Sequence, residues 1–390
     1  MQFQNVSKRA IRNFSGSPSR RLVLSSIAMS LSAPKRVGIA AEPNSIRTNP
    51  GLNWERFSSP EAAGFRSAGL DTLEQTLFSK PTTALLIATR GKIVYSYGDI
   101  NQVSYLASAR KSVLSILYGK YVGNGTVDLN KTVGELGIDE AGGGLLPIEK
   151  TATIRHLLMS SSGVYWPESN PSGNSLPPPK RGSKTPGEYF YYNNWDYNVA
   201  GAVFEQLTGK TVFRALAEDL AGPLQLQDFD LGRQRMLGYP GTQSSRYKSY
   251  QMWLSARDMA RLGLVMVNGG VWNGREIVPR SWVKESTALH VKSAAISNLS
   301  DVMGYAYMWW KPSVSKQQPE WADSYLAYGN HGQCILGLPA IETVVVHKRA
   351  LPDEFAIAIN TGRTKLKPAG GPLTYVDFLT LADIIVAARI

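Results

Sequence analysis

Ser108 and Lys111 stand three positions apart in the stretch SYLASARKSVLSILYGKYVGNG (104–125), where an apolar run begins. If this stretch is helical, positions i and i+3 share a face, so the Lys111 amine can reach the Ser108 hydroxyl while Arg110 points elsewhere. A serine hydroxyl becomes a good nucleophile when a neighbouring base takes its proton. Desolvation can lower the pKa of a lysine enough for that task. The pair therefore indicates nucleophilic attack on a carbonyl.

The spacing alone decides nothing, because Ser-x-x-Lys occurs five times: at Ser32, Ser108, Ser245, Ser281 and Ser313. The alternative interpretation of any one copy is a helix-capping serine followed by a surface lysine. The surrounding sequence must distinguish the copies.

A second stretch, GEYFYYNNWDYNVAGAVFEQLTG (187–209), contains two overlapping Tyr-x-Asn triplets, Tyr191/Asn193 and Tyr192/Asn194, ahead of a long helical pattern. A tyrosine beside a buried lysine can relay a proton between a nucleophile and a leaving group, and an asparagine amide can orient both. Aromatic and Asn clusters are also common in loops packed under helices, so this motif is weak in isolation.

Three stretches in this order resemble the motifs of the serine β-lactamase and penicillin-binding protein superfamily: SARK at 108–111, YNNWDY at 192–197 and a late Gly-rich strand. The resemblance is greatest to the class C-like branch of esterases, D-amino-acid peptidases and 6-aminohexanoate-dimer hydrolases, and it covers roughly residues 55–390. The order of motifs selects Ser108 as the nucleophile, and the following Asp196-Tyr197 selects Tyr192 and Asn194. It implies that Lys111 and Tyr192 share the base role.

The third motif departs from the pattern of many members, which have a cation, then Ser or Thr, then Gly. This chain has Ala327-Tyr328-Gly329, followed by Asn330-His331-Gly332-Gln333. Gly329 allows a close approach of the strand, and the resemblance makes the N–H groups of Ser108 and Asn330 the oxyanion donors. The missing cation argues against β-lactam recognition. His331 either replaces that contact or is a strand histidine with satisfied hydrogen bonds.

The elements that must position these residues follow from periodicity. A hairpin is expected at 83–99 and a helix from 108. Further helical patterns lie at 153–160, 198–209, 212–222, 256–270, 279–287 and 374–389, and strand patterns at 305–310, 324–338, 342–348 and 354–360. Strands at both ends and helices between them predict an α+β, β-lactamase-like fold: an antiparallel sheet flanked by helices, with an inserted all-helical lobe.

The 390 residues carry a net charge of +12, and more than half of it lies in the first 50 residues, where eight Lys or Arg face one acid, Glu42. The paired Arg20-Arg21 before a weakly apolar stretch is typical of an export signal, with a twin-arginine resemblance; a disordered basic tail is the alternative. The expected division is a leader at 1–41, a linker at 42–60 and a hydrolase domain of two lobes at 61–390. We expect a periplasmic or extracellular protein.

The sequence therefore predicts a serine hydrolase that cleaves ester or amide bonds of small molecules through a Ser108 acyl-enzyme. Two alternatives stay open: a non-catalytic binding or sensing module, and a true β-lactamase or DD-peptidase. The Pro/Ser/Gly-rich segment at 163–189 is long enough to be functional, and we expect it to set selectivity and its Tyr165 to contact substrate together with Gly329 and His331. No metal or cofactor motif occurs, no nucleic-acid partner or membrane span is expected, and nothing indicates an oligomeric state.

Overall fold

The computed structural model describes residues 49–390, apart from 175, 242, 293–302, 313–315 and 364–369. The expected export leader therefore lies outside the described residues. No helix in the described part of the chain is long and apolar enough to cross a membrane.

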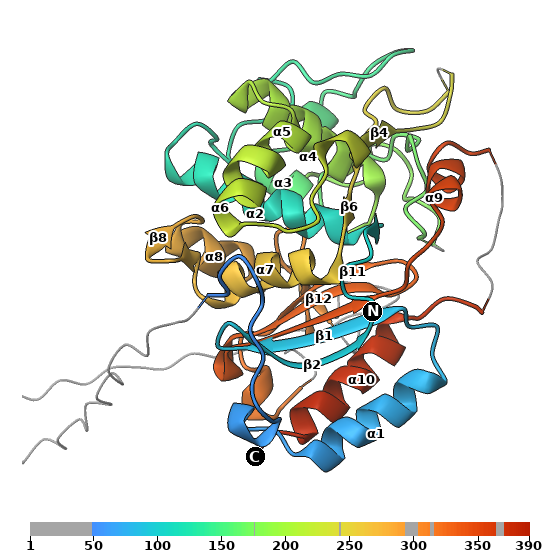
Figure 1. Ribbon diagram of the computed structural model, residues 1–390. Coiled ribbons are helices and arrows are strands. Elements are labelled where there is room, and N and C mark those ends of the chain that lie inside the picture. Colours follow the sequence, from blue (N-terminus) through green and yellow to red (C-terminus); the bar gives the residue numbers. More distant parts are fainter. Residues whose placement is uncertain (1–48, 175, 242, 293–302, 313–315, 364–369) are drawn as a thin grey trace, which may run out of the picture. The chain divides into compact units, whose positions relative to one another are not determined.

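A seven-stranded antiparallel sheet carries the fold (Figure 1). Its spatial order is β2 (Lys92–Gly98), β1 (Ala84–Thr89), β13 (Thr343–Lys348), β12 (Gln333–Leu338), β11 (Tyr325–Gly329), β10 (Trp310–Lys311) and β9 (Gly304–Tyr305). Every residue of β1, β12 and β13 is buried, because helices cover both faces of the central sheet. Continuous apolar runs are typical of strands buried on both faces.

The expected hairpin at 83–99 is confirmed as β1 and β2. Its two-residue turn uses Arg90 and Gly91, both with positive φ (47° and 78°). This turn type matches the twist of the strands that it joins.

Helices α1 (Ser67–Phe78) and α10 (Tyr375–Ala387) pack together on one face of the sheet, and α7 (Ala256–Val267) lies against β12 and β13 on the other (Figure 1). The helical lobe beyond α7 contains α2 (Ala109–Gly123), α3 (Ile154–Leu158), α4 (Asn194–Thr208), α5 (Val212–Ala215), a π-helical turn at Leu216–Ala221 and α6 (Gly222–Leu224). Helix α8 (Arg280–Ser286) packs on α2. The expected sheet with an inserted helical lobe is confirmed.

Short elements complete the chain. They are the two-stranded pairs β3 (Ser104–Tyr105) with β6 (Trp253–Leu254), β4 (Arg235–Leu237) with β5 (Ser249–Gln251), and β7 (Val271–Trp272) with β8 (Arg275–Glu276), together with 3-10 turns at Glu61–Ala63, Glu149–Thr151, Leu231–Arg233, Pro319–Trp321 and Pro339–Ile341. The β3–β6 pair matters most here, because it holds the chain just before Ser108.

The strand expected at 354–360 is wrong: Asp353–Asn360 form helix α9. A short apolar run cannot be assigned to strand or helix by periodicity alone. The start signals were present, since Pro352 precedes Asp353 and Glu354, and acids in a first turn favour a helix. Phe355, Ala356 and Asn360 are the buried residues of this helix.

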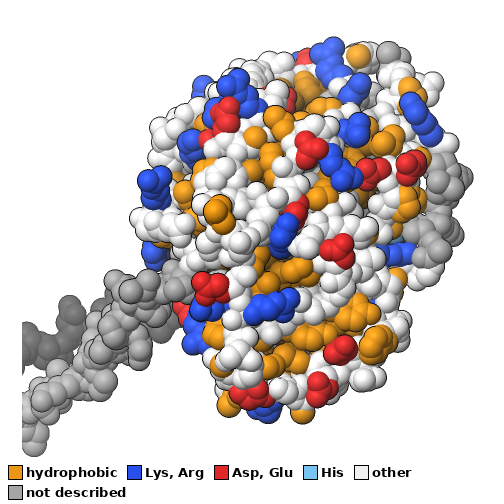
Figure 2. Space-filling model, in the orientation of Figure 1, with side chains coloured by type: hydrophobic (Ala, Val, Ile, Leu, Met, Phe, Trp, Pro, Cys, Tyr) orange, Lys and Arg blue, Asp and Glu red, His pale blue; other side chains and the backbone are white. Residues whose placement is uncertain are grey.

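Charged side chains are distributed over the surface rather than gathered. On the face seen in Figure 2, Lys and Arg side chains are interspersed with Asp and Glu among the described residues. Some ion pairs between them, such as Lys92 with Glu55, are solvent-exposed on both sides. Such pairs contribute little stability individually.

Candidate active site

Ser108 lies at the start of α2, in the N-cap position. One turn later, Lys111 Nζ lies 3.1 Å from Ser108 Oγ. The helical spacing thus produces the contact that the sequence predicts. Lys111 itself is only 2% exposed, so its amine is held in a dry environment.

Ala107, just before the nucleophile, has a left-handed backbone with φ of 49°. This conformation is unfavourable for a residue with a Cβ and persists where the surroundings enforce it. The preceding Leu106 donates its N–H to Met252 O (2.9 Å), next to the β3–β6 pair. The chain therefore bends sharply between β3 and α2, at the residue before Ser108, and Ser108 begins the helix as its N-cap.

Tyr192 completes the group from the segment before α4. Its Oη lies 2.6 Å from Lys111 Nζ, so the Lys111 amine contacts both the Tyr192 and the Ser108 hydroxyl groups. The ring stacks on Trp310 of β10 (centroids 5.6 Å apart, planes at 25°). Lys111 Nζ lies 4.3 Å from the ring centroids of both Tyr192 and Tyr197. The Ser108 hydroxyl, the Lys111 amine and the Tyr192 hydroxyl therefore lie together, although they come from two distant segments, and aromatic rings pack around them.

Electrostatics set the protonation states. Burial, and then the positive charge of Arg110, hold the pKa of Lys111 well below its ordinary value, while the Glu168 carboxylate partly opposes them. Burial raises the pKa of Tyr192 to about 12. Both effects disfavour the charged form, which favours a neutral Lys111 amine and a neutral Tyr192 phenol. Lys111 is then the stronger base, and Tyr192 is suited to carry a proton.

Glu168 is a site residue that the sequence analysis missed. Its carboxylate accepts the backbone N–H of Asn194 (2.6 Å) through one oxygen and that of Ser172 (3.0 Å) through the other. Burial raises its pKa, and it faces Lys111 closely enough for each to influence the other. The one sequence feature that could have pointed to Glu168 is its position as an acidic residue within the loop at 163–189. Glu168 ties this loop to the start of α4.

Asn194 has other partners than expected. Its Nδ2 donates to the carbonyl oxygens of Pro171 (2.8 Å) and Asn170 (3.3 Å) rather than to Lys111 or Tyr192. Its Oδ1 is buried with no partner in the described part of the chain. The Asn194 side chain therefore anchors the loop beside Ser108. It makes no hydrogen bond to Lys111 or Tyr192 in the described structure, so it does not orient that pair as expected.

Gly329 brings the end of β11 against the nucleophile. A Cβ at this position would lie 2.4 Å from Leu106 O and 3.0 Å from Ser108 N, so only glycine fits. Within the described residues, neither the Ser108 N–H nor the Asn330 N–H has an acceptor. Two free donors beside one hydroxyl have the arrangement that oxyanion stabilisation requires.

His331 and Tyr165 differ in their placement. His331 has a positive φ of 68°, lines the same cavity as Ser108 and has no partner for its buried Nδ1. Burial and Arg349 lower its pKa, so the ring is neutral. Its Nδ1 is thus unsatisfied, unlike the satisfied strand histidine considered above. Tyr165 packs edge-on against Tyr191 (5.6 Å) and lines a neighbouring cavity instead, because the loop reaches Ser108 only at 170–174.

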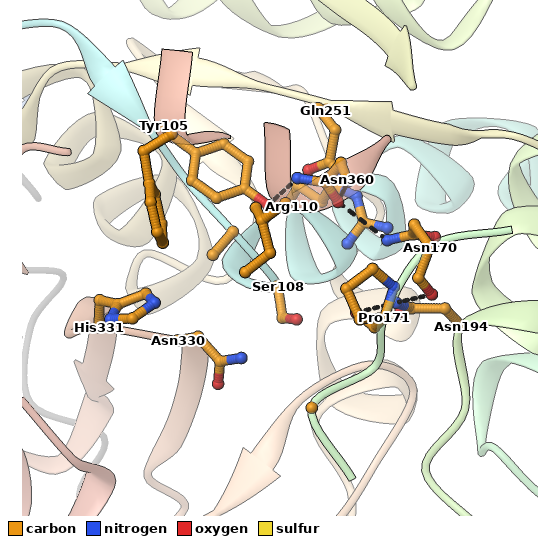
Figure 3. A pocket seen from close by; sticks show the side chains of 14 residues that line it. Tyr105, Ser108, Arg110, Asn170, Pro171, Asn194, Gln251, Asn330, His331 and Asn360 are labelled. Atoms are coloured by element: carbon orange, nitrogen blue, oxygen red, sulfur yellow. Dashed lines mark hydrogen bonds between the residues drawn. The ribbon is translucent and has the colours of Figure 1, made fainter. Parts of the chain in front are cut away.

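Ser108 lies between two cavities. The smaller, of about 80 Å³, is lined largely by amide side chains (Figure 3). The larger, of about 270 Å³, contains Tyr192 with the aromatic rings of Trp310, Tyr328 and Tyr375. Gly173 of the loop at 163–189 and Asn330 line both. The loop thus contributes to both sides of the nucleophile. No cluster of metal-ligating side chains occurs among the described residues.

The Beta-lactamase family model matches residues 70–356, which contain Ser108, Lys111, Tyr192 and Gly329. The chain belongs to the beta-lactamase family. No sequence among the curated proteins matches this beta-lactamase family member at a significant level.

Solved structures share the fold at low sequence identity. A putative beta-lactamase from Bacteroides dorei superposes with a TM-score of 0.58 at 16% identity, over 83% of this chain and 99% of that one. A putative 6-aminohexanoate-dimer hydrolase from Bacillus anthracis gives 0.53 at 18% identity, over 81% and 80%. EstCE1, a hydrolase with promiscuous acyltransferase activity, gives 0.52 at 16% identity, over 75% and 97%. These similarities establish a beta-lactamase fold for this family member.

Proposed function

We propose that this protein is a serine hydrolase that cleaves ester or amide bonds of small molecules through a Ser108 acyl-enzyme. The contact of Ser108 Oγ with Lys111 Nζ, and of that amine with Tyr192 Oη, carries the proposal. A nucleophile, a base and a proton carrier in one hydrogen-bonded group are what acyl transfer needs.

In the acylation step, the neutral Lys111 amine accepts the Ser108 proton as Oγ forms a bond to the substrate carbonyl carbon. The N–H groups of Ser108 and Asn330 donate to the oxygen that becomes negative. As the carbonyl–heteroatom bond breaks, Tyr192 gives its proton to the leaving group and regains one from the Lys111 ammonium. In deacylation, water gives a proton through Tyr192 to Lys111 as its oxygen bonds to the acyl carbon, and Ser108 Oγ takes a proton back from Lys111 as the Oγ–acyl bond breaks.

The larger cavity is the leaving-group side, because Tyr192 lines it and must reach the departing atom. The described residues that line this cavity are neutral. A β-lactam carries its carboxylate beside the departing nitrogen, and a carboxylate left unpaired in a partly dry site loses affinity. Ala327, where many relatives have a cation, is fully buried. These observations favour neutral leaving groups over β-lactams.

The decisive experiment is labelling with a fluorophosphonate probe together with p-nitrophenyl ester hydrolysis. Ser108→Ala is expected to abolish both. Ser281→Ala is the matched control, because Ser281 belongs to another Ser-x-x-Lys pair and is exposed; it is expected to retain both. Labelling that persists in Ser108→Ala would contradict the mechanism. Absence of labelling in the folded wild-type protein would favour the non-catalytic alternative.

A further inference from the structure

The smaller cavity beside Ser108 has an unusual lining. Five amide side chains surround it, together with the guanidinium of Arg110 and the apolar side chains of α9 (Figure 3). The amides are those of Asn170, Asn194, Gln251, Asn330 and Asn360. Among the described residues, Arg110 is the one lining side chain with a permanent charge.

Arg110 is buried without an acid. It is 1% exposed, and it makes no ion pair in the described part of the chain. Its hydrogen bond is a long one, from Nη2 to Asn198 Oδ1 (3.4 Å), and its Nε has no partner. The guanidinium also lies 5.0 Å from the Tyr250 ring centroid, which stabilises the cation but does not neutralise it. Buried arginines are usually paired with a carboxylate.

Other charges nearby do not balance Arg110. Lys111 is neutral in the resting site, for the reasons given above, and so is His331. Glu168 is the one acid among the described residues that influences Lys111, and its oxygens are already engaged by two backbone N–H groups. A cavity with a guanidinium and no counter-ion attracts an anion.

The cavity also contains acceptors without donors. Gln251 Oε1 and Asn194 Oδ1 are both buried without partners in the described structure. A volume of about 80 Å³ accommodates a carboxylate with a short methylene chain and room for a water. That water would donate to the two amide oxygens, while the carboxylate would accept from Arg110. A carboxylate and one water would thus supply the partners that the Arg110 guanidinium and the two amide oxygens lack.

The position of Tyr192 indicates which part of a substrate enters the smaller cavity. Tyr192 lines the larger cavity and not the smaller one, so the leaving group departs on the larger side. The acyl portion then extends from Ser108 into the smaller cavity.

We propose that this cavity binds a carboxylate at the far end of the acyl group, held by Arg110, so that the preferred substrates are half-esters or half-amides of short dicarboxylic acids. The inference rests on the proposed function. Ser108 Oγ forms the new ester bond, the alcohol or amine leaves with the proton from Tyr192, and water releases the free dicarboxylate. The second carboxylate takes no part in bond making.

The test compares matched esters in a pH-stat. Monoethyl succinate, glutarate and adipate are compared with ethyl butanoate, pentanoate and hexanoate, which lack only the terminal carboxylate. We expect kcat/KM to favour at least one half-ester by about 10-fold or more in the wild-type protein. Arg110→Met, which retains an unbranched apolar side chain, is expected to bring that ratio to about one, and Arg110→Lys to restore part of it. A ratio at or below one in the wild type, or an unchanged ratio in Arg110→Met, would overturn the inference.

A second measurement needs no folded Arg110 variant. Glutarate is expected to inhibit ethyl acetate hydrolysis by the wild-type protein competitively, whereas glutaramide, of the same length and without charge, is expected to inhibit at least about 10-fold more weakly. Equal inhibition would overturn the inference and leave the proposed function intact. If the wild type hydrolyses no ester and Ser108 is not labelled, the proposed function fails; calorimetry of glutarate against glutaramide with Ser108→Ala then decides the carboxylate site separately.

Discussion

At the scale of single residues, the proposed chemistry depends on two side chains whose pKa values are displaced in opposite directions. Burial lowers the pKa of Lys111 and raises that of Tyr192. Because burial disfavours its charged form, the Lys111 amine can be uncharged at a pH where an exposed lysine is protonated. Because the amine must be neutral to accept the Ser108 proton, kcat/KM is expected to rise with pH through the pKa of Lys111, at a midpoint well below the ordinary lysine value.

Glu168→Gln tests this arrangement. The Glu168 carboxylate raises the pKa of Lys111, so its removal is expected to move the midpoint of the acidic limb of kcat/KM to lower pH. The Gln oxygen can still accept the Asn194 N–H, so the loop retains that anchor. The measurement is a pH profile with a p-nitrophenyl ester. A midpoint that stays in place or moves upward would show that Lys111 does not titrate in this limb.

At the scale of elements, three segments far apart in sequence converge at the start of α2. Strand β11 presents Gly329, the bend after β3 presents Ser108, and the segment before α4 presents Tyr192. The closeness of β11 to α2 leaves no space for a side chain at Gly329. The geometry of the site therefore depends on backbone packing between elements as well as on side chains.

Gly329→Ala is expected to lower kcat by about 10²-fold or more, because the new methyl group forces β11 away from the Ser108 N–H and the oxyanion loses a donor. Gly51→Ala is the matched control, since nothing lies within 4 Å of a Cβ there. Steady-state kinetics, with circular dichroism as a check of folding, measure the effect. Equal activity of the two variants would contradict the assigned oxyanion site.

The turn after β11 is anchored by His347 of β13. Its Nδ1 lies 2.6 Å from Gly332 O and must carry the proton, and its Nε2 lies 2.9 Å from Thr82 Oγ1 and accepts from it. Burial lowers the pKa of His347 to about 4. The neutral ring is thus fully paired, and an added proton has no acceptor at Nε2.

The folded state consequently binds fewer protons than the unfolded chain between about pH 6.5 and pH 4, so His347 is expected to reduce stability as the pH falls through this window. The loss amounts to about 3 kcal/mol at full extent. Urea unfolding at pH 7 and pH 4.5 is expected to show a smaller pH-dependent loss in His347→Gln than in the wild type. Identical losses would mean that His347 is not the linked group.

At the scale of the whole molecule, the loop at 163–189, the sheet edge and the helical lobe enclose two cavities of different character. The larger cavity, the proposed leaving-group side, is aromatic and neutral in its described lining. The smaller cavity, the proposed acyl side, contains Arg110 and five amides. This asymmetry, rather than the nucleophile, is expected to distinguish substrates, because any carbonyl can react with the same serine.

We expect kcat/KM for short-chain p-nitrophenyl esters to exceed that for nitrocefin or a D-Ala-D-Ala peptide by at least about 10-fold, a difference of about 1.4 kcal/mol. Tyr375→Lys places a cation on the wall of the larger cavity and is expected to narrow the gap, with Tyr375→Gln as the uncharged control. Ala327 is less suitable for this test, because its side chain is fully buried. Wild-type turnover of nitrocefin equal to that of the esters would show that a carboxylate is accommodated without such a cation.

The amino-acid sequence by itself determined the features that depend on local spacing and on the order of motifs. The i, i+3 contact of Ser108 with Lys111 follows from helix geometry, and the hairpin at 83–99 follows from its alternation and its Arg-Gly turn. The succession of three motifs identified the family, which the family model confirms, and predicted Ser108 as the nucleophile. These inferences succeed because neighbours within one turn, or across one tight turn, have little freedom to be elsewhere.

Only the tertiary structure decided which distant side chains meet. Helix geometry places Arg110 off the face that Ser108 shares with Lys111, yet Arg110 and Ser108 line one cavity. The other lining residues of that cavity include Asn360 and Phe355 of α9, a helix whose sequence resembled a strand. Glu168 reaches Lys111 only because its loop folds back onto the start of α4. Asn194 donates a hydrogen bond to that loop instead of contacting Lys111 or Tyr192. Long-range pairing depends on topology and packing, which the spacing of residues along a chain does not encode.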